Sequence, residues 1–336
     1  MSCLRKMRVA VVGAGVFGLA IALGLARAGA IVKLVERDGE VNASSIAAGM
    51  LAPAFEAALD PLSHDHFDLF MRARDLWPEF LDGLGPVGFE RCGAQMTAPA
   101  EVLEPLAVRM SADGARCEFT ADGLFTPEDW RITPLRALAE MRSALRKLGG
   151  VERRKAVVRV TENTITGSDG AVYEADAVVL ACGYGGLDLA PELAALIPIK
   201  GQLIRFEAGP LSGGPILRGK GGYVVPGQDG AAAGATMQAG LDDRTVDSDV
   251  SVRLLAPALD LAPQLSGLAF TAHAGVRPAT PDGLPMIGKS AGGAWLATGA
   301  RRNGWLLAPL AARLIASGLA GGGEDVRLTP ARFTPC

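Results

Sequence analysis

A short apolar run, a turn and a helical repeat open the chain. Residues 9–12 are all apolar, as in a buried strand, and a second apolar run follows at 31–35. Between them, apolar residues recur with the 3.6-residue period of a helix at Leu19, Ala22, Leu23 and Ala26. Gly29 is placed to end that helix. The pattern predicts a strand, a helix and a second strand at the N-terminus.

Helical and strand-like segments alternate along the rest of the chain. Apolar positions on one side predict further helices over residues 67–84, 134–148 and 306–319. The apolar run at 177–181 predicts a parallel strand buried on both faces. Segments punctuated by Gly, Pro, Asp and Asn predict short strands within 85–130, 157–170 and 201–270. Residues 320–336 carry no clear pattern, and we expect them to be loosely ordered.

This order predicts an α/β chain, α+β overall, in which a Rossmann-like domain is interrupted by a β-rich domain. We assign residues 1–84, 131–200 and 270–330 to a discontinuous nucleotide-binding domain. The β-rich domain, which would hold the substrate, takes 85–130 and 201–269.

Three glycines between the first strand and helix form the motif G-x-G-x-x-G. Gly13 permits the tight turn, Gly15 lets the backbone approach a pyrophosphate, and Gly18 lets the helix pack on the strand. The free N–H groups at the helix start would face the phosphates. Glu36, which ends the second strand, can accept hydrogen bonds from both ribose hydroxyls and would repel the 2′-phosphate of NADP. The unit predicts a dinucleotide site and leaves NAD and FAD open.

Composition limits the other readings. Gly makes up 43 of 336 residues, so the alternative to a dinucleotide motif is a chance cluster of glycines in a Gly-rich chain. The excess of glycine also suits close approach of the backbone to a ligand. The net charge of −3 leaves no broad basic surface for nucleic acid. No apolar stretch approaches the roughly 20 residues that a membrane-spanning helix needs.

The cysteines indicate neither a zinc site nor a disulfide framework. They are odd in number and widely scattered, at Cys3, Cys92, Cys117, Cys182 and Cys336. A reducing cytoplasm is therefore the simplest location. Basic residues before the first apolar run resemble a secretory signal, but the glycines interrupt that run and no cleavage site follows.

A metal site is not expected. His64, Asp65 and His66 lie together, yet the remaining histidine, His273, is distant in the sequence. A solvated helix start is the better reading of this cluster.

Beyond the N-terminal motif and Glu36, four segments give the chain a resemblance to the D-amino acid oxidase family of FAD-dependent enzymes, nearest to its glycine oxidases of thiamine biosynthesis. They are A-A-G-M-L at 47–51, Y-V-V-P at 223–226, G-V-R-P-A-T-P-D-G-L-P at 275–285 and R-N-G-W-L-L-A-P at 302–309. The resemblance spans nearly the whole chain and selects FAD over NAD. It implies that the cofactor contacts come from Gly13, Ala14, Gly15, Val16, Phe17, Gly18, Glu36, Arg37, Ala48, Gly49, Met50, Leu51, Val158, Ala181, Gly183, Arg277, Arg302, Asn303, Gly304, Trp305 and Leu306.

Two of these segments suit the flavin end of FAD. The loop at Gly49 and Met50 follows the ribose-binding strand, so its N–H groups can bond the flavin edge, although an ordinary Gly-rich loop is the alternative. The residues Arg302, Asn303 and Gly304 precede an apolar helix, whose N-terminus would favour negative charge on reduced flavin. A capped surface helix is the alternative there.

The resemblance also implies the substrate-binding side chains. Arg277, in G-x-R-P, matches the family arginine that binds the substrate carboxylate, and a guanidinium offers the planar fork this requires. Tyr223 matches a tyrosine that supports the same carboxylate, and Arg302 is the third residue we assign to catalysis as an added positive charge. A structural salt bridge for Arg277 and a core position for Tyr223 are the alternatives.

The chain departs from the pattern of glycine oxidases at several places. Ala300 and Arg301 replace a bulky pair, His273 stands where an aromatic residue is common, and Gly221 and Gly222 precede Tyr223 where a histidine is usual. These changes leave the preferred amine open. The absence of a cysteine between Cys182 and Cys336 favours non-covalent FAD over the covalent flavin of sarcosine oxidases.

The resemblance implies oxidative deamination of glycine or another small amino acid to the imine and oxo acid, with O2 reduced to H2O2. No side-chain base at the α-carbon is required, because positioning and the cofactor account for the chemistry. The alternatives are a D-amino acid, N-methylglycine or 2-hydroxy acid dehydrogenase with another acceptor, and a non-catalytic FAD-binding scaffold or tRNA-modification component. The partners expected are the amino acid and an electron acceptor, and assembly into a homo-oligomer stays open.

Overall fold

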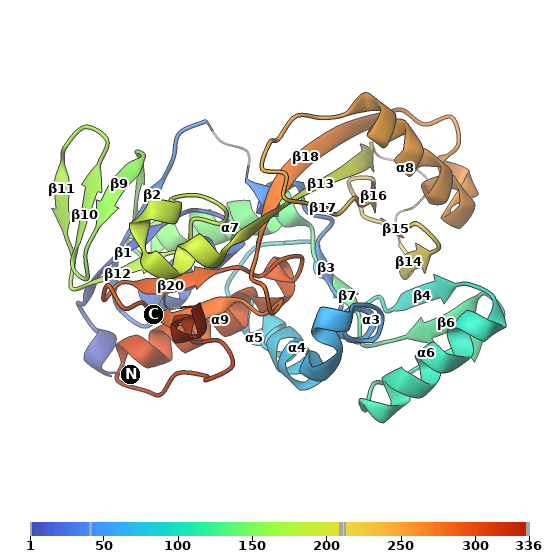
Figure 1. Ribbon diagram of the computed structural model, residues 1–336, viewed down its shortest axis with the longest axis horizontal. Helices are drawn as coiled ribbons and strands as arrows, with labels where there is room; N and C mark the ends of the chain where they lie inside the picture. The colour runs from blue at the N-terminus through green and yellow to red at the C-terminus, as the bar shows by residue number, and fades with distance from the viewer. Residues whose placement is uncertain (1, 40–41, 208–210, 212, 334–336) are drawn as a thin grey trace.

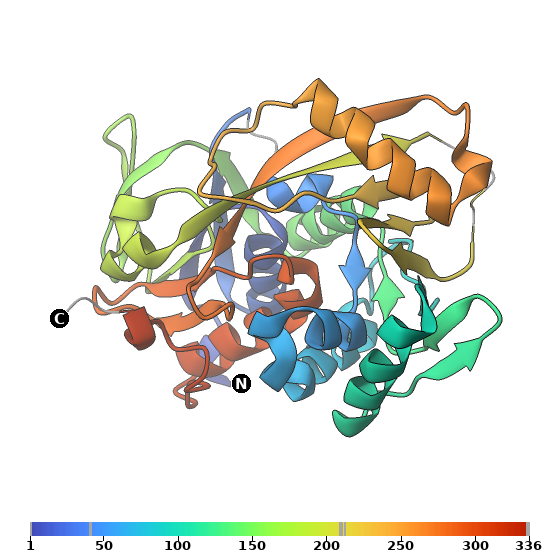
Figure 2. The ribbon, with the colours of Figure 1, turned by 45° about the vertical axis from the view of Figure 1, so that its right-hand side comes forward.

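The computed structural model describes residues 2–39, 42–207, 211 and 213–333. Cys336 and the end of the predicted tail lie outside them. In Figure 1 and Figure 2 the part predicted to bind the nucleotide, which holds both ends of the described chain, stands beside a large curved sheet. No helix in the described part combines the length and apolarity needed to cross a membrane.

A mostly parallel sheet forms the centre of the nucleotide-binding part. Its middle strand is fully apolar after its first residue and is buried from Val9 to Val12, because helices and strands cover both of its faces. Within the described residues its order is β19 (Met286–Lys289), β20 (Trp295–Thr298), β12 (Ala177–Leu180), β1 (Arg8–Val12), β2 (Ile31–Glu36) and β8 (Val151–Arg154). All neighbours run parallel except β19 and β20.

Apolar helices cover this sheet. Helix α1 (Val16–Arg27) is buried over most of its length because it packs against α9 (Gly304–Leu319) and α7 (Pro134–Lys147). The predicted helix over 67–84 is instead divided into α4 (Phe67–Asp75) and α5 (Trp77–Phe80). Pro78 explains the break, since proline cannot donate the hydrogen bond that a continuous helix requires. A side sheet on this part, a β-meander as predicted, consists of β9 (Val157–Val160), β10 (Thr164–Gly167) and β11 (Val172–Glu174).

The second large sheet is mostly antiparallel. Its described strands follow the order β17 (Gln238–Ala239), β13 (Ile197–Phe206), β16 (Ala231–Gly234), β15 (Gly222–Val225), β14 (Ile216–Gly219), β4 (Ala94–Thr97), β6 (Gly123–Thr126) and β5 (Glu118–Thr120), while β18 (Phe270–Ala279) also pairs with β13. The predicted boundary at residue 270 therefore separates β18 from the sheet in which it lies. The division of the chain into domains otherwise remains a prediction.

Two helices lie where the sequence indicated only strands and turns. They are α6 (Ala100–Ala112), which lies between β4 and β5, and α8 (Ser248–Leu261), which packs on β13, β15 and β16. In α8 the side chain of Asp247 accepts hydrogen bonds from the N–H groups of Asp249 and Val250. This N-cap and the apolar spacing of Val250, Leu254 and Ala258 were the signals that could have identified it.

Short segments connect the two parts. Between them run β3 (Met50–Leu51), which pairs with β7 (Trp130–Arg131), and the short helices α2 (Ala43–Ile46) and α3 (Pro53–Leu59). The 3-10 turns of the described chain are Ser2–Leu4, Pro61–His66, Leu187–Leu189, Pro191–Ala195, Pro263–Leu265 and Pro330–Phe333.

Candidate functional site

A cavity opens at the carboxyl ends of β1, β2 and β12. Its wall includes Glu36, Arg37 and Lys155, and also Arg302 and Trp305. The predicted residues on its wall are Gly13, Ala14, Gly15, Val16, Phe17, Glu36, Arg37, Ala181, Gly183, Arg277, Arg302, Gly304 and Trp305. Ligands in open α/β sheets bind at this edge.

Two glycines of the N-terminal motif leave no room for a side chain, because backbone atoms lie where a Cβ would be. Gly13 has φ +105°, and a Cβ there would lie 2.2 Å from the carbonyl oxygen of Ala181. A Cβ on Gly18 would lie 1.8 Å from the oxygen of Gly13. The N–H of Val16, in the first turn of α1, donates to Ser44 Oγ at 3.0 Å. Ser44 was missed because nothing in the sequence links it to a turn 28 residues earlier.

Glu36 is held by an arginine that the sequence did not indicate. Arg142 on α7 donates from both Nη atoms to the two carboxylate oxygens of Glu36, at 3.0 and 2.7 Å, and also pairs with Glu152. The carboxylate therefore has a fixed orientation at the end of β2 and keeps lone pairs for further donors.

Some of the predicted cofactor residues lie away from the cavity. Val158 is 59% exposed, and its neighbour Val157 lines the wall instead, because side chains alternate along β9. Gly18, Leu51 and Leu306 contribute packing: Gly18 gives close helix–strand contact, and the two leucines are buried in the core.

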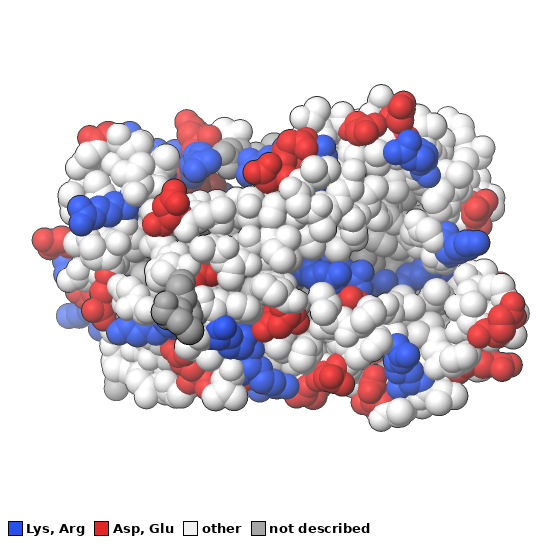
Figure 3. Space-filling view, viewed as in Figure 1, with Lys and Arg blue, Asp and Glu red and all other residues white. Residues whose placement is uncertain are grey.

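A second cavity continues from the first and reaches the face of the large sheet. Both cavities share Ala43, Ala47, Arg277, Arg302 and Trp305. The second also takes the predicted residues Ala48, Gly49, Met50, Tyr223 and Asn303 into its wall. In Figure 3, Lys and Arg side chains gather in the hollow between the part that carries α8 and β18 and the part that carries α3 and α6.

The loop at Gly49 is anchored on two sides. Arg205 on β13 donates from Nη2 to the carbonyl oxygens of Ile46 and Ala47, at 3.2 and 2.6 Å. The carbonyl of Gly49 accepts from the N–H of Ile132 at 2.9 Å. These bonds hold the backbone of residues 46–49 at the junction of the two cavities.

Arg277 lies across the large sheet with its guanidinium uncompensated. Its side chain passes over Gly201 on β13, where a Cβ would lie 1.8 Å from Arg277 Nη1. Nη1 donates to the carbonyl of Thr236 at 3.2 Å, and no carboxylate of the described residues lies within 4 Å. Burial lowers the pKa of Arg277 from its ordinary value, but a guanidinium remains cationic at neutral pH. The geometry therefore does not support the alternative that Arg277 forms a structural salt bridge.

Tyr223 is beside Arg277 on the same cavity wall. It lies on β15 opposite Gly234, and an added Cβ on that glycine would be 3.3 Å from the hydroxyl. Burial raises the pKa of Tyr223, with Arg277 opposing the shift, so the hydroxyl keeps its proton at neutral pH. A protonated hydroxyl and a free guanidinium thus point to an anion in this cavity.

Arg302 does not offer the free charge that the sequence suggested. Its Nε lies 2.5 Å from Glu56 Oε2 and its Nη2 3.3 Å from Asp60 Oδ2, and Arg301 also pairs with Asp60. Both carboxylates are at least nine-tenths buried. Arg302 lines both cavities, but its positive charge is largely compensated there.

Two wall residues were missed from the sequence: Glu56 on α3 and Arg218 on β14. Arg218 Nη2 lies 3.3 Å from Glu56 Oε1, and Arg218 directly faces Tyr223 across the β14–β15 pair. Glu56 lies a few residues after the flavin loop, and this position is the signal by which the sequence could have identified it. Arg218 had none, because its place depends on strand pairing.

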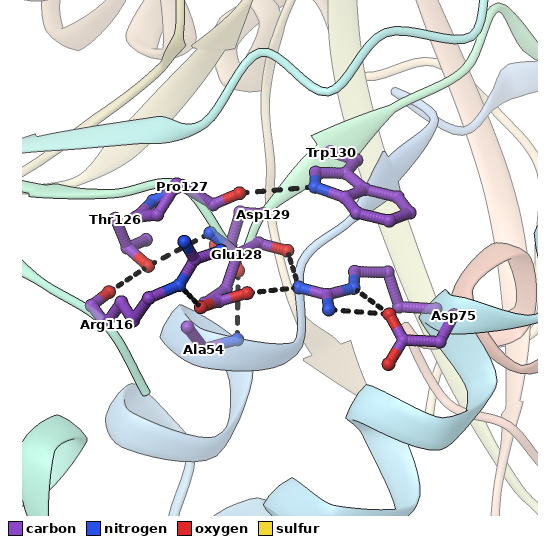
Figure 4. A network of polar contacts seen from close by, with 9 residues as sticks. Ala54, Asp75, Arg116, Thr126, Pro127, Glu128, Asp129 and Trp130 are labelled. Atoms are coloured by element: carbon purple, nitrogen blue, oxygen red, sulfur yellow. Dashed lines mark hydrogen bonds and ion pairs between the residues drawn. The ribbon is translucent and has the colours of Figure 1, made fainter. Parts of the chain in front are cut away.

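A buried polar network holds α3, and so Glu56, in place. The N–H of Ala54 in its first turn donates to Asp129 Oδ1 at 2.9 Å. Beside it, Glu128 pairs with Arg116 at 2.6 Å and with Arg74, whose guanidinium lies over the ring of Trp130. Figure 4 shows Ala54, Asp129 and Glu128 converging at this point. The network fixes the start of the helix from the adjoining strand.

Asp129 gives this network a pH dependence. Burial raises its pKa from 3.8 to about 7, and Oδ2 has no hydrogen-bond partner among the described residues. Between pH 3.8 and about 7 the Asp129 carboxyl is therefore protonated in the folded protein but ionised in the unfolded chain. The free energy of unfolding falls as pH rises through this range, by at most about 1.4 kcal/mol per pH unit.

Replacement of Asp129 by asparagine should abolish this pH dependence. Between pH 5.5 and 7.5 the buried proton accounts for a loss of about 2 kcal/mol in the free energy of unfolding, and we expect Asp129→Asn to lack that loss when unfolding by urea is measured.

The exposed Asp113→Asn is the matched control for that measurement. It should leave the pH profile of the free energy of unfolding as it is in the unchanged protein. Parallel profiles for Asp129→Asn and the unchanged protein would refute the buried proton.

The two cavities fit FAD. Gly15 leaves the wall of the first cavity free of a side chain at the start of α1, where N–H groups favour phosphate. Glu36, fixed by Arg142, would take the ribose at one end, and the shared residues with the Gly49 loop would take the flavin at the other. Non-covalent binding remains the prediction, since Cys336 is not described. Among the described residues no three potential ligands group around a metal position.

Comparison with known proteins gives the same assignment. A glycine oxidase of Pseudomonas aeruginosa is 29% identical over 98% of both chains. The bifunctional protein ThiO/ThiG of a Nostoc species is 32% identical over 92% of this chain, which spans about half (52%) of that relative. The crystal structure of glycine oxidase from Geobacillus kaustophilus matches with a TM-score of 0.82 at 26% identity, over 98% of each chain. The family model "DAO: FAD dependent oxidoreductase" matches residues 8–317, so the chain belongs to this family and uses FAD.

Proposed function

We propose that this protein is an amino acid oxidase that converts a small primary or secondary amino acid, with glycine as the simplest case, to its imine. The observation that carries the proposal is the uncompensated guanidinium of Arg277 beside the protonated hydroxyl of Tyr223, in a cavity continuous with the FAD site. Relatives named glycine oxidase support the same class of substrate.

The residues of the chain bind and orient the substrate. Arg277 holds the α-carboxylate through its planar fork and Tyr223 donates its hydroxyl to the same group, so that the α-carbon is directed to the shared end of the two cavities. Bound FAD supplies the hydride acceptor, with dioxygen as the proposed final acceptor and hydrogen peroxide as the product.

Other groups set the electrostatics of the site. The N-terminus of α9 begins at Gly304 on the cavity wall, and its positive dipole end favours negative charge there. Glu56 lies between Arg218 and Arg302, and both guanidinium groups pair with its carboxylate. In the proposed reaction the substrate reacts as the neutral amine and its α-hydrogen leaves as hydride, so no side-chain base at the α-carbon is required.

The resemblance to the glycine oxidases of thiamine biosynthesis, together with a relative named ThiO/ThiG, supports a role for the imine in thiazole synthesis for thiamine. A dehydrogenase that uses another acceptor is the second candidate, and a non-catalytic scaffold or tRNA-modification component is the third. Location in the cytoplasm and assembly into a homo-oligomer remain predictions from the sequence.

Anaerobic mixing with a panel of amines tests the function. Glycine, N-methylglycine, D-alanine and iminodiacetate should be tried in turn while the visible absorbance of bound flavin is followed, and at least one should bleach it. If none does, amine oxidation is wrong and the scaffold remains. Peroxide on readmission of air identifies an oxidase, whereas bleaching without peroxide identifies a dehydrogenase.

A further inference from the structure

Arg218 is a second cation in the substrate cavity. It lies on β14 opposite Tyr223, which in turn is opposite Gly234 on β16, and Gly234 is opposite Leu203 on β13. Directly opposed residues share a sheet face, so Arg218 stands on the face that carries Tyr223. Arg277 reaches the same cavity from the other side of this row. The two guanidinium groups therefore approach one cavity from opposite sides of Tyr223.

The guanidinium of Arg218 has few partners of its own. The residue is 8% exposed, and its Nε has no hydrogen-bond partner among the described residues. Nη2 lies 3.3 Å from Glu56 Oε1 and 3.6 Å from Met50 Sδ, while the group lies over the ring of Phe55. Buried guanidinium groups normally have several donors satisfied, which leaves this one with capacity for an anion.

The charges of the cavity wall do not cancel. Its charged lining residues in the described chain are Arg218, Arg277, Arg302 and Glu56, a sum of +2. Glu56 makes its shorter contact with Arg302, at 2.5 Å. No nitrogen of Arg218 lies within 4 Å of the Asp129 carboxylate; burial raises the pKa of Asp129 to about 7, although the charge of Arg218 opposes the shift. A glycine anion would leave one of these buried charges unmatched.

We propose that the preferred substrate carries two carboxylates on one amine or α-carbon framework, such as an N-carboxyalkyl glycine or an acidic amino acid. One carboxylate is held by Arg277 and Tyr223, and the other by Arg218. A neutral-amine dianion brings the cavity to zero net charge, which a buried site favours. This substrate class rests on the proposed amine oxidation and narrows it.

The reaction balances with groups already named. With iminodiacetate, a methylene carbon loses hydride and the nitrogen loses its proton, so that the C–H and N–H bonds are replaced by C=N. The two electrons pass to FAD. Water then adds to the imine, and cleavage of the C–N bond releases glyoxylate and glycine.

A matched pair of amines tests the proposal. Iminodiacetate and N-methylglycine are both secondary amines and differ by one carboxylate. We expect kcat/KM to be at least about 30-fold higher for iminodiacetate, the low end for a buried charge pair. Arg218→Met should abolish most of this ratio, and Arg218→Lys should restore part of it.

An equilibrium measurement separates binding from turnover. Thiodiacetate and (methylthio)acetate form the corresponding pair that cannot be oxidised as amines, and their Kd values follow from perturbation of the flavin spectrum. Thiodiacetate should bind at least about 30-fold more tightly, and the preference should vanish in Arg218→Met. Thermal unfolding and flavin content establish that each variant is folded.

The outcomes separate the two proposals. Bleaching by glycine or N-methylglycine, with no preference for either dicarboxylate, would overturn the second carboxylate site and leave amine oxidation standing. A ratio that is unchanged in Arg218→Met would also overturn it. Tight thiodiacetate binding with no bleaching by any amine would support the site and refute the oxidase.

Discussion

Replacement of Arg277 by methionine is expected to lower kcat/KM for amino acids by roughly 10²–10³, mainly through a higher KM, because a buried charge-assisted pair is lost. Within the described residues this guanidinium has no carboxylate to neutralise it, so its charge is available to a ligand. The measurement is steady-state kinetics, together with the Kd of a carboxylate inhibitor read from the flavin spectrum. Unchanged values of both would remove Arg277 from carboxylate binding.

Gly201→Ala provides an independent test that keeps the charge. A Cβ at this position would lie 1.8 Å from Arg277 Nη1, so the guanidinium must move from its present place. We expect weaker carboxylate binding with a normal content of FAD. The control is Gly323→Ala, where no atom lies within 4 Å of the added carbon. Equal carboxylate affinity in the two variants would mean that the path of Arg277 over β13 does not matter.

Gly49→Ala is expected to produce the second large effect, a loss of both FAD retention and stability. Gly49 has φ +83°, and a Cβ would lie 2.0 Å from the carbonyl oxygen of Ile132. That oxygen belongs to the backbone and cannot rotate away, so the flavin loop must shift. The backbone strain and the overpacking together amount to about 2–5 kcal/mol. Flavin content per chain and urea unfolding of the protein with and without FAD measure the two losses.

Gly83→Ala is the matched control, because it isolates the cost of the backbone conformation. Gly83 has φ +74° but no atom within 4 Å of an added Cβ. It should lose only about 1–2 kcal/mol and retain FAD fully. If the two variants behave alike, the contact with Ile132 is not what requires glycine at position 49.

The sequence by itself determined the nucleotide end of the site. Hydrophobic periodicity and the glycine spacing identified β1, α1 and β2, because these elements depend on neighbours within about 30 residues. Steric contact explains the glycines: the backbone of Ala181 lies where a side chain on Gly13 would be. The periodicity of α8 was also local, but turn-forming residues on both sides concealed it.

The family resemblance extended this to FAD, which the family match confirms. It also named Arg277 and Tyr223, and the structure brings these two residues to one cavity wall. Their roles toward substrate remain proposals. Val158 shows the limit of such transfer, because a shift of one residue along a strand exchanges the inner face for the outer.

Only the tertiary structure decided which charges of the site are matched. Arg142 meets Glu36 from 106 positions away, and Arg218 meets Glu56 from 162. No local sequence pattern encodes such pairs, because the side chains meet only through the strand register and helix packing of the folded chain. The sequence thus predicted a dinucleotide site and a carboxylate-binding arginine, and the folded structure adds Arg218 beside Arg277 as the two charges that we propose a substrate matches.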